Sequence, residues 1–359
     1  MPETWPLYPR TPILLCFDRQ LASSWARGEG CVRRRDFIKA IAGSAALWPL
    51  SARAQENNKL AKIGYLGPSS LALERSQVDA LRERLHELGH VEGKSIVYVF
   101  RWAEGHDARY PALAAELVSL KPDVIVTTGT PGTLAAKRAT STIPIVFASS
   151  ANPVNAGLVA AYSRPGGNVT GFTILGPELE GKRVQLLKEA IPGASRIAVM
   201  WNPANPGIVD FLHQTRAAAA ALNLTVKPVA EVAHAGQLKD AFAAIADAQP
   251  QGMVVIADRS LLAHRADIVN FAAAQRLPTI YPYRGYVDAG GFMSYAPIDV
   301  DQFRHAASAV DKILRGAKPG ELPVEEPVRF ELVINLKTAK SLGLEVSPFL
   351  QQRADALIE

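Results

Sequence analysis

Short apolar runs alternate with longer segments of helical periodicity along most of this chain, and this alternation constrains the fold more than any other feature. The run 61–67 ends in turn residues, which is typical of a buried strand. Residues 72–88 follow with apolar side chains at helical spacing, and Gly89 ends the segment. Strands that alternate with helices predict parallel sheets with helices on both faces. We therefore expect an α/β protein.

The alternation occurs in two sets, which predicts two similar doubly wound lobes joined by crossover strands. In the first set we expect strands at 61–67, 95–100, 123–127 and 143–148 and helices at 72–88, 108–120 and 133–139. In the second set we expect strands at 196–200, 224–228, 252–257 and 279–281 and helices at 207–222, 235–247 and 260–275.

Gly/Pro-rich segments near 166–176 and 294–300 are expected to carry the chain between the lobes. The expected division places 60–172 and about 297–326 in lobe 1, including a helix at 300–315, and 173–296 in lobe 2. Residues 327–359 are expected to end as a strand and a helix, and the sequence leaves their lobe open.

A predicted export signal precedes the two sets of strands and helices. Three arginines at 33–35 stand before an apolar run at 40–50 and an Ala-x-Ala site that ends at Ala54. This order is typical of a cleaved secretory leader, and the run is shorter than the roughly 20 residues that span a bilayer. With Phe37 beyond them, the arginines resemble the twin-arginine signal. We predict that residues 32–54 are read by the twin-arginine export machinery, that cleavage follows Ala54, and that the protein is periplasmic. The alternative is a core helix with a basic N-terminus.

Residues 1–31 mix Trp and Pro without periodicity and do not fit the start of a leader. We expect them to be a non-native extension. Our hypothesis is that translation starts at Val32, which directly precedes the arginines and would be read as Met from a GTG codon.

Charge and cysteine content narrow the functional class. The first 54 residues hold 8 of the 39 Lys and Arg and 4 of the 34 Asp and Glu, so the remainder carries 31 against 30 and a net charge of about +1. This balance gives no reason to expect a nucleic-acid partner. Both cysteines, Cys16 and Cys31, precede the predicted cleavage site. We therefore expect a processed protein without a disulfide or a thiolate site.

One motif resembles a metal site. His86 and His90 match the zinc-protease pattern His-Glu-x-x-His, but that pattern needs both histidines on one continuous helix. Because Gly89 is a natural helix stop, we expect no metal site here and no cofactor elsewhere. The chain also lacks a Gly-x-Ser-x-Gly elbow, so we do not expect an enzyme.

Polar loops follow the predicted strands. Ligands bind outside the carboxyl ends of strands in open parallel sheets, so these loops are the candidate site. Ordinary turn composition is the alternative for any single loop. The candidate ligand-binding residues are Ser69, Ser70, Thr130, Ser149, Ser150, Asn152, Trp201, Asn202, Asp258, Tyr281, Arg284 and Tyr295.

The candidate residues suit a ligand that carries both an ammonium group and a carboxylate. Asp258 would face an ammonium group, and we expect Asp258→Ala to weaken binding at least about tenfold without unfolding the protein. An intramolecular pair with Arg259 or Arg284 is the alternative. Thr130, at a predicted helix start, would face a carboxylate together with the serines and Asn152, unless it only caps the helix.

The remaining candidates have two possible roles each. Arg284 would pair with a second acid on the ligand or with Asp288. Tyrosines would form flat walls against an apolar ligand body or pack in the core. The tyrosines concerned are Tyr65, Tyr281, Tyr283 and Tyr295.

Several stretches carry a family resemblance. They are 130–136 (TPGTLAA), 152–159 (NPVNAGLV), 164–171 (RPGGNVTG), and 323–325 (PVE) with 331–340 (ELVINLKTAK). Together they resemble the ABC-transporter substrate-binding family whose better-known members take up tryptophan and tyrosine. The resemblance runs from about residue 60 to 345. It implies a type I periplasmic-binding fold, a small-molecule ligand, an ABC permease as partner and a monomer.

The chain departs from that family at one loop. Members with an aromatic amino-acid ligand tend to read Thr-Asp-Asn where this chain reads Ala257-Asp258-Arg259. The tyrosine-rich segment 281–286 also differs from the smaller residues found there. The resemblance therefore implies an amino acid or related carboxylate and leaves its identity open. A ligand-sensing subunit of a membrane receptor and a secreted α/β enzyme remain the alternatives.

Overall fold

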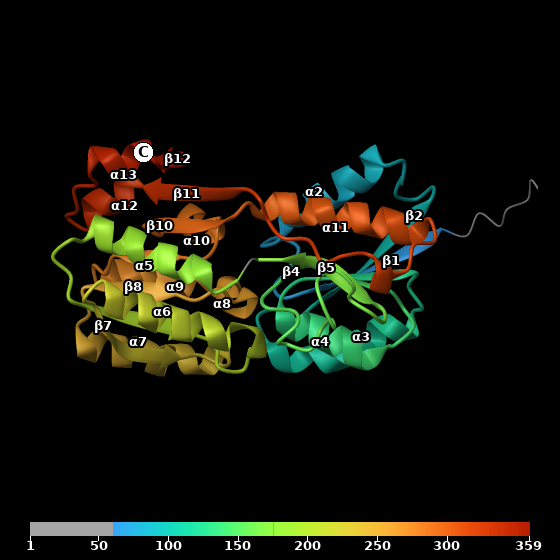
Figure 1. Cartoon of the computed structure of the whole chain (residues 1–359), viewed down its shortest axis with the longest axis horizontal. Helices are drawn as coiled ribbons and strands as arrows, with labels where there is room; N and C mark the ends of the chain where they lie inside the picture. Colours follow the sequence, from blue (N-terminus) through green and yellow to red (C-terminus); the bar gives the residue numbers. More distant parts are fainter. Residues whose placement is uncertain (1–59, 175) are drawn as a thin grey trace, which may run out of the picture. The chain divides into compact units, whose positions relative to one another are not determined.

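The predicted alternation of strands and helices is confirmed in a computed structural model, which describes residues 60–174 and 176–359 (Figure 1). The strands form two separate sheets, one of five strands and one of seven. The predicted leader at 32–54 and the segment before it lie outside the described residues.

The five-stranded sheet contains the first set of strands, and all its neighbouring strands are parallel. Its order is β2 (Ile96–Trp102), β1 (Ala61–Gly67), β3 (Val124–Thr127), β4 (Ile145–Ser150) and β5 (Val169–Thr173). The accompanying helices are α2 (Arg75–Glu87), the short 3-10 helix η2 (Asp107–Arg109), α3 (Tyr110–Ser119) and α4 (Thr130–Ala139).

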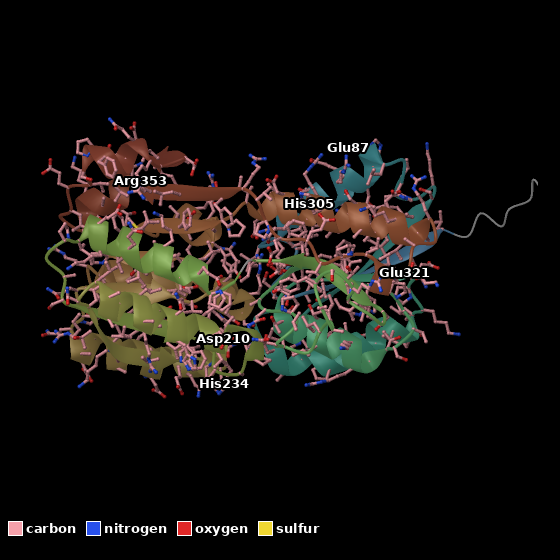
Figure 2. All side chains as sticks on the ribbon, in the orientation of Figure 1. Glu87, Asp210, His234, His305, Glu321 and Arg353 are labelled. Atoms are coloured by element: carbon pink, nitrogen blue, oxygen red, sulfur yellow. The ribbon has the colours of Figure 1, made fainter. Side chains whose placement is uncertain are left out.

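Helix α11 (Asp299–Leu314) also belongs to the five-stranded sheet, as predicted for residues 300–315. Phe303 and Val310 of α11 share one hydrophobic cluster with Leu81 of α2 and Ile63 of β1. His305, labelled in Figure 2, stacks on Phe172 of β5 with ring centres 4.5 Å apart. The helices α2 and α11 therefore cover one face of this sheet.

The other face of the five-stranded sheet packs on α3 and α4. Ile125 and Phe147 of the strands cluster there with Leu117 and Ala136 of the two helices, and all four are fully buried. Burial on both faces explains why these strands read as continuous apolar runs rather than alternating ones.

The seven-stranded sheet contains the second set and the C-terminal strands. Its order is β12 (Ala356–Ile358), β11 (Phe330–Asn335), β10 (Met293–Pro297), β9 (Thr279–Tyr281), β8 (Gly252–Val255), β6 (Arg196–Trp201) and β7 (Thr225–Glu231). Its helices are α5 (Glu178–Ala190), α6 (Val209–Ala221), α7 (Leu238–Ala248), α8 (Arg259–Ala263), α9 (Arg265–Ala274), α10 (Arg284–Asp288), α12 (Leu336–Ser341) and α13 (Pro348–Gln352). Its short 3-10 helices are η3 (Pro206–Ile208) and η4 (Ala235–Gln237), whereas η5 (Pro319–Glu321) packs beside β5 of the five-stranded sheet.

One strand pair departs from the predicted parallel arrangement. Strand β11 runs antiparallel to β10, with Tyr295 opposite Leu332, because the chain leaves β10, forms α11 and returns along the neighbouring edge. The tail from 327 onward thus joins the seven-stranded sheet through β11 and β12.

Other differences concern element bounds. The segment expected to be one helix at 260–275 is two helices, α8 and α9, that meet at His264. The helix α5 was not expected at all. The chain passes between the sheets at the segments near 166–176 and 294–300, as expected, but these segments also contain β5 and β10 respectively.

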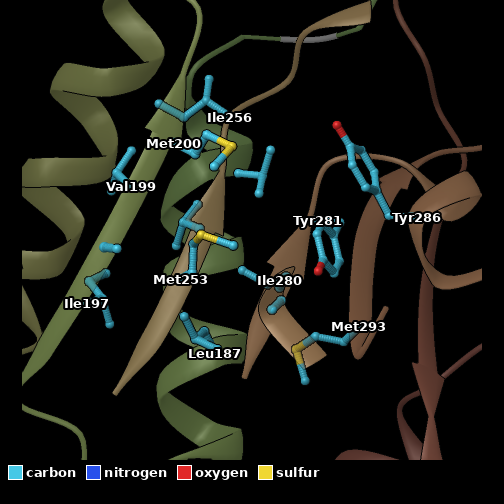
Figure 3. Packing of buried hydrophobic residues seen from close by; sticks show 14 of the residues in the cluster. Leu187, Ile197, Val199, Met200, Met253, Ile256, Ile280, Tyr281, Tyr286 and Met293 are labelled. Atoms are coloured by element: carbon cyan, nitrogen blue, oxygen red, sulfur yellow. The ribbon is translucent and has the colours of Figure 1, made fainter. Parts of the chain in front are cut away.

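The core of the seven-stranded sheet is shown in Figure 3. Ile197, Met253 and Ile280 come from three adjacent strands and are fully buried, and Leu187 of α5 packs on them. Burying one such side chain contributes about 1.5–3 kcal/mol. This apolar interior holds the strand ends, and thus their polar loops, in fixed positions.

Gly171 explains part of the 164–171 motif. Its φ is +154°, and a Cβ atom at this position would lie 2.1 Å from the carbonyl oxygen of Phe147 on the neighbouring strand. Only glycine fits so close a backbone approach.

The structure bears on two other features. No helix in the described part of the chain is long and apolar enough to cross a membrane.

The helix α2 ends at Glu87, as predicted from Gly89, and the Nε2 atom of His90 lies 2.8 Å from Asp311. No group of three or more His, Cys, Asp or Glu within 60–174 and 176–359 is arranged to hold a metal ion.

Candidate functional site

The carboxyl ends of strands from both sheets border one small cavity. The cavity measures about 10 Å³, so the strand ends nearly meet in this structure. Its wall combines hydroxyl, amide, carboxylate and guanidinium groups. The lining residues are Gly129, Thr130, Ser149, Ser150, Ala151, Ile174, Asn205, Ala257, Asp258, Arg259 and Tyr283.

The first-sheet side of the cavity is lined by hydroxyl groups. Thr130 is the first residue of α4, and its Oγ1 lies 3.0 Å from the Oγ of Ser150. The same oxygen donates to the carbonyl of Ala151 at 3.2 Å. The N-cap residue of α4 is Gly129, so the alternative that Thr130 merely caps the helix is wrong. Thr130 and Ser150 are buried and polar at a helix start, which is an environment suited to an anion.

Arg259 brings a cation from the second-sheet side. Its Nη1 and Nη2 atoms donate to the carboxylate of Asp299, at the start of α11, and Nη2 also donates to the Oγ of Ser149 at 3.0 Å. The guanidinium carbon lies 4.3 Å from the ring centre of Tyr283. Burial opposes the charged form, but Asp299 holds the pKa of Arg259 above its ordinary value. The cation is therefore permanent.

Asp258 is nearly fully buried and is the N-cap of α8. Its carboxylate accepts from the Nδ2 atoms of Asn202 and Asn205 at 3.4 and 2.8 Å. It also accepts from the backbone N–H groups of Ser260 and Leu261 at 3.0 Å each. Burial raises the pKa of Asp258, although these four donors oppose the rise.

The alternative pairing proposed for Asp258 is not the one observed. Arg259 pairs with Asp299 instead, and Arg284 pairs with Asp288 and Glu331. Asp258 is held by amides rather than by a cation, which leaves its negative charge without a neutralising partner among the described residues. Such a buried charge favours a positive group nearby.

A second carboxylate lies near Asp258. Asp107 belongs to η2, after the carboxyl end of β2, and accepts a hydrogen bond from the hydroxyl of Ser260. Its other oxygen is buried without a partner in the described part of the chain. Burial, followed by the charge of Asp258, raises the pKa of Asp107 to about 6.

Glu74 is a third buried acid beside the first-sheet loops. It accepts from the hydroxyl of Tyr65 at 2.7 Å and from the backbone N–H and hydroxyl of Ser69 at 2.8 and 2.6 Å. Burial raises the pKa of Glu74. The side chains of Tyr65 and Ser69 are therefore held in place by Glu74. The adjacent Ser70 accepts from the N–H of Leu73 through its hydroxyl at 3.4 Å.

Asn152 connects the two sheets at another point. Its Nδ2 donates to Asp210 of α6 at 3.0 Å, and the Nδ2 of Asn155 donates to the same oxygen at 3.1 Å. Asp210 is labelled in Figure 2. Asp210 therefore binds two side chains of the loop that follows β4.

Several expected site residues lie elsewhere. Tyr281 is buried and stacks on Tyr286 at 4.6 Å, within the core of Figure 3. Tyr295 stacks on Phe330 at 6.0 Å, and Trp201 is buried at the end of β6.

Arg284 lines a different hollow, together with Gln77, Arg265, Asp288 and Glu331. The alternative pairing of Arg284 with Asp288, at 3.4 Å, is the one observed. Of the twelve candidates, the cavity wall therefore contains Thr130, Ser149, Ser150 and Asp258.

Glu74 and Asp107, which do not line the cavity, were not among the predicted residues, and Arg259 was considered only as a partner for Asp258. A signal for Asp107 was available, because the loop after β2 also leaves the carboxyl edge of the sheet. Glu74 lies at the start of α2, where its distance from the strand end concealed it.

Comparisons with known proteins identify relatives over most of the chain. Residues 70–358 match the family described as ABC transporter substrate binding protein. A "Tyrosine-binding protein" of Clostridioides difficile (strain R20291) is 28% identical over 266 residues, covering 73% of this chain and 74% of that protein.

Two solved structures are similar to the whole described region. A conserved domain protein of Vibrio cholerae has a TM-score of 0.78 at 28% identity, covering 83% of this chain and 100% of that one. An ABC domain from Streptococcus pneumonia in complex with L-Trp has a TM-score of 0.77 at 23% identity, covering 84% and 100%. The similarity confirms the predicted type I periplasmic-binding fold. The chain belongs to the ABC transporter substrate-binding protein family.

Proposed function

We propose that this protein captures a small solute, an amino acid or related carboxylate, between its two sheet-bearing halves and delivers it to an ABC permease. The observation that carries the proposal is the cavity at the strand ends, whose wall joins Thr130, Ser149 and Ser150 to Asp258 and Arg259. Hydroxyls from one sheet and charged groups from the other are suited to a small polar ligand. The relatives named for tyrosine and crystallised with L-Trp support the amino-acid class.

Capture would proceed by hinge closure. Ligand contacts with both halves stabilise the closed form over the open one, and the permease would then recognise the closed surface. Direct side-chain contacts between the halves support this scheme. They include Arg259 with Asp299 and with Ser149, Ser260 with Asp107, and Asn152 with Asp210.

In this proposal the site residues divide by charge. Thr130, Ser149 and Ser150 would bind the ligand carboxylate, with Asn152 beside them at the end of β4. Asp258 would face the ammonium group with Asn202 beside it. Ser69 and Ser70 would border the site from the loop after β1.

The expected location is the periplasm, reached through the twin-arginine machinery. The sequence at 32–54 supports this part of the proposal. N-terminal sequencing of the exported protein should find Gln55 first. A mature chain that still carries residues 33–35 would contradict the leader assignment.

A thermal-shift screen tests the proposed function. The protein, refolded to strip carried-over ligand, is screened against amino acids and aromatic carboxylates. A ligand at 100 times its Kd adds about 2.7 kcal/mol of stability, which a melting curve detects. Binding with the solute recovered unaltered supports capture, whereas chemical conversion of the solute would indicate an enzyme. A panel without any hit would exclude the amino-acid class.

Asp258→Ala tests the ammonium role. We expect at least about tenfold weaker binding of an amino acid by calorimetry, since a buried charged contact is lost. Because Asp258 also caps α8, the variant should lose about 1 kcal/mol of stability. Ser347→Ala, which removes the cap of the distant helix α13, is the matched control and should leave affinity unchanged.

A further inference from the structure

Arg259 carries a hydrogen-bond donor that no residue in the described part of the chain uses. Its side chain is only 5% exposed, and its Nε–H is buried without a partner. A buried donor left unpaired is costly, and native structures keep few of them. The unused donor is therefore evidence of a function for this position beyond packing.

The geometry of the guanidinium shows where this donor points. The group has five N–H donors in a planar fork. One edge, formed by Nη1 and Nη2, is taken by the two oxygens of Asp299. The second N–H of Nη2 donates to the Oγ of Ser149. In a planar guanidinium this N–H is parallel to Nε–H, so the two form a second edge that Ser149 fills only in part.

The hydroxyl-lined side of this second edge suits an anion, whereas Asp258 in the same cavity suits a cation. Ser149 and Ser150, at the end of β4, and the start of the ten-residue helix α4 line the same cavity as Arg259. The Ser149 hydroxyl accepts from Arg259, so its own proton is available for another acceptor. A carboxylate placed there would receive two parallel N–H donors and one hydroxyl donor.

We infer that Arg259 is the cationic part of an anion subsite, and that its Nε–H and Nη2–H edge binds the carboxylate of the captured solute. The inference rests on the proposed function and narrows it: the solute must carry a carboxylate, because a carboxamide offers one acceptor oxygen to the two parallel donors and an ammonium group offers none. Asp299 positions the guanidinium, and the ring of Tyr283 fixes its plane.

A purely structural role makes a different prediction. If Arg259 only neutralises Asp299, removing both charges together should restore the protein. If Arg259 binds the solute, the double variant stays defective. The double variant Arg259→Gln/Asp299→Asn therefore separates the two roles.

The test is calorimetry on the purified protein with matched probes. The carboxylates are L-tyrosine, L-tryptophan and benzoate, and the matched neutral analogues are L-tyrosinamide, L-tryptophanamide and benzamide. We expect Arg259→Gln and the double variant to bind the carboxylates about 10- to 100-fold more weakly than the unaltered protein, with the carboxamides changed less than about threefold. Arg265→Gln, on the next helix, is the control and should bind as the unaltered protein does.

Each outcome has one meaning. Carboxylate affinity that is unchanged in Arg259→Gln, or restored in the double variant, overturns the anion subsite and leaves solute capture standing. A preference of the unaltered protein for the carboxamides also overturns the subsite alone. Failure of the unaltered protein to bind any probe overturns both the subsite and the amino-acid class. If Arg259→Gln does not fold, Arg259→Lys keeps the charge beside Asp299, lacks the Nε fork, and should show the same loss.

Discussion

The Nη1 and Nη2 atoms of Arg259 lie 2.9 and 2.6 Å from the two carboxylate oxygens of Asp299. Arg259 begins α8 beside the seven-stranded sheet, whereas Asp299 begins α11, which covers the five-stranded sheet. A two-pronged ion pair thus ties the two halves together at the cavity. Its arginine is 5% exposed and its aspartate 21% exposed, so solvent screens it only partly.

Removing the carboxylate of this pair should be costly. Asp299→Asn leaves a buried guanidinium without its counter-charge, and we expect a loss of about 3 kcal/mol in urea unfolding. Asp301→Asn, which disrupts a pair with the largely exposed Arg329, is the control and should change stability by less than about 1 kcal/mol. Equal effects of the two variants would contradict the buried character of the pair.

The Arg259–Asp299 pair should also make the stability of the protein fall at low pH. Burial acts to raise the pKa of Asp299, but Arg259 lowers it below its ordinary value. The contribution of the pair is therefore fully present above pH 4 and is lost as the pH falls further through the folded-state pKa. Between pH 2 and 5, the free energy of unfolding should depend less on pH for Asp299→Asn than for the unaltered protein.

Asp107 should produce the opposite dependence. Its pKa is about 6 in the folded protein, because of burial and the charge of Asp258, against an ordinary value of 3.8. The folded state then holds more protons than the unfolded state between these values, so stability falls as the pH rises from about 4 to 6. Asp107→Asn keeps an acceptor for the Ser260 hydroxyl and should be more stable at pH 7 by about 1–3 kcal/mol.

The measurement is the melting temperature of the ligand-free protein between pH 4 and 7. The curve of Asp107→Asn should be flatter than that of the unaltered protein in this window. Asp240→Asn, an exposed position on α7, should leave the curve unchanged. A variant curve parallel to that of the unaltered protein would exclude Asp107 as the source.

A second ion pair lies wholly within the seven-stranded half. Glu180 and Arg183 of α5 are 0% and 1% exposed, and the Nε of Arg183 donates to the carbonyl of Tyr295 at 2.9 Å. Arg183→Met should cost about 3–5 kcal/mol, because it leaves a buried carboxylate unpaired. The double variant Glu180→Leu/Arg183→Met removes both charges and should recover most of that loss in denaturant unfolding. A double variant as unstable as Arg183→Met would show that packing, not charge, dominates.

Gly171→Ala should disrupt the five-stranded sheet. The new Cβ would lie 2.1 Å from the Phe147 carbonyl, so β4 and β5 must separate, and we expect a loss of more than about 3 kcal/mol or failure to fold. Gly193→Ala, where an added Cβ meets nothing within 4 Å, is the control and should change stability by less than about 1 kcal/mol. Soluble yield and thermal melting compare the two, and similar melting temperatures would contradict the steric argument.

Strand positions were predictable because burial on both faces leaves an unmistakable apolar run. The expected strand at 61–67 matches β1, and 279–281 matches β9. Helix α5 was not predicted, since its buried charged residues Glu180 and Arg183 interrupt the apolar face that a sequence pattern requires. The strand expected after residue 327 is present as β11, but its antiparallel direction was not predicted, because strand direction depends on where α11 packs rather than on local sequence.

The sequence predicted which loops form the candidate site, but not which side chains pair within it. The rule for parallel strand ends found the loops that supply Thr130, Ser149 and Asp258. It could not assign partners, because the pairing of Arg259 with Asp299 depends on how α8 and α11 meet. Tyrosines at 281 and 295 were misleading, since their chemistry suits a ligand wall and a core equally well.

The place of α11 has a consequence for synthesis on the ribosome. Phe303, Ala307 and Val310 complete the cluster around Ile63 and Leu81, yet they follow nearly all of the seven-stranded half in the chain. One apolar face of the five-stranded sheet therefore stays uncovered while the strands β6 to β10 are translated. The nascent chain cannot finish its N-terminal half first, and a chaperone that shields that face until Leu314 has emerged would be matched to this order of synthesis.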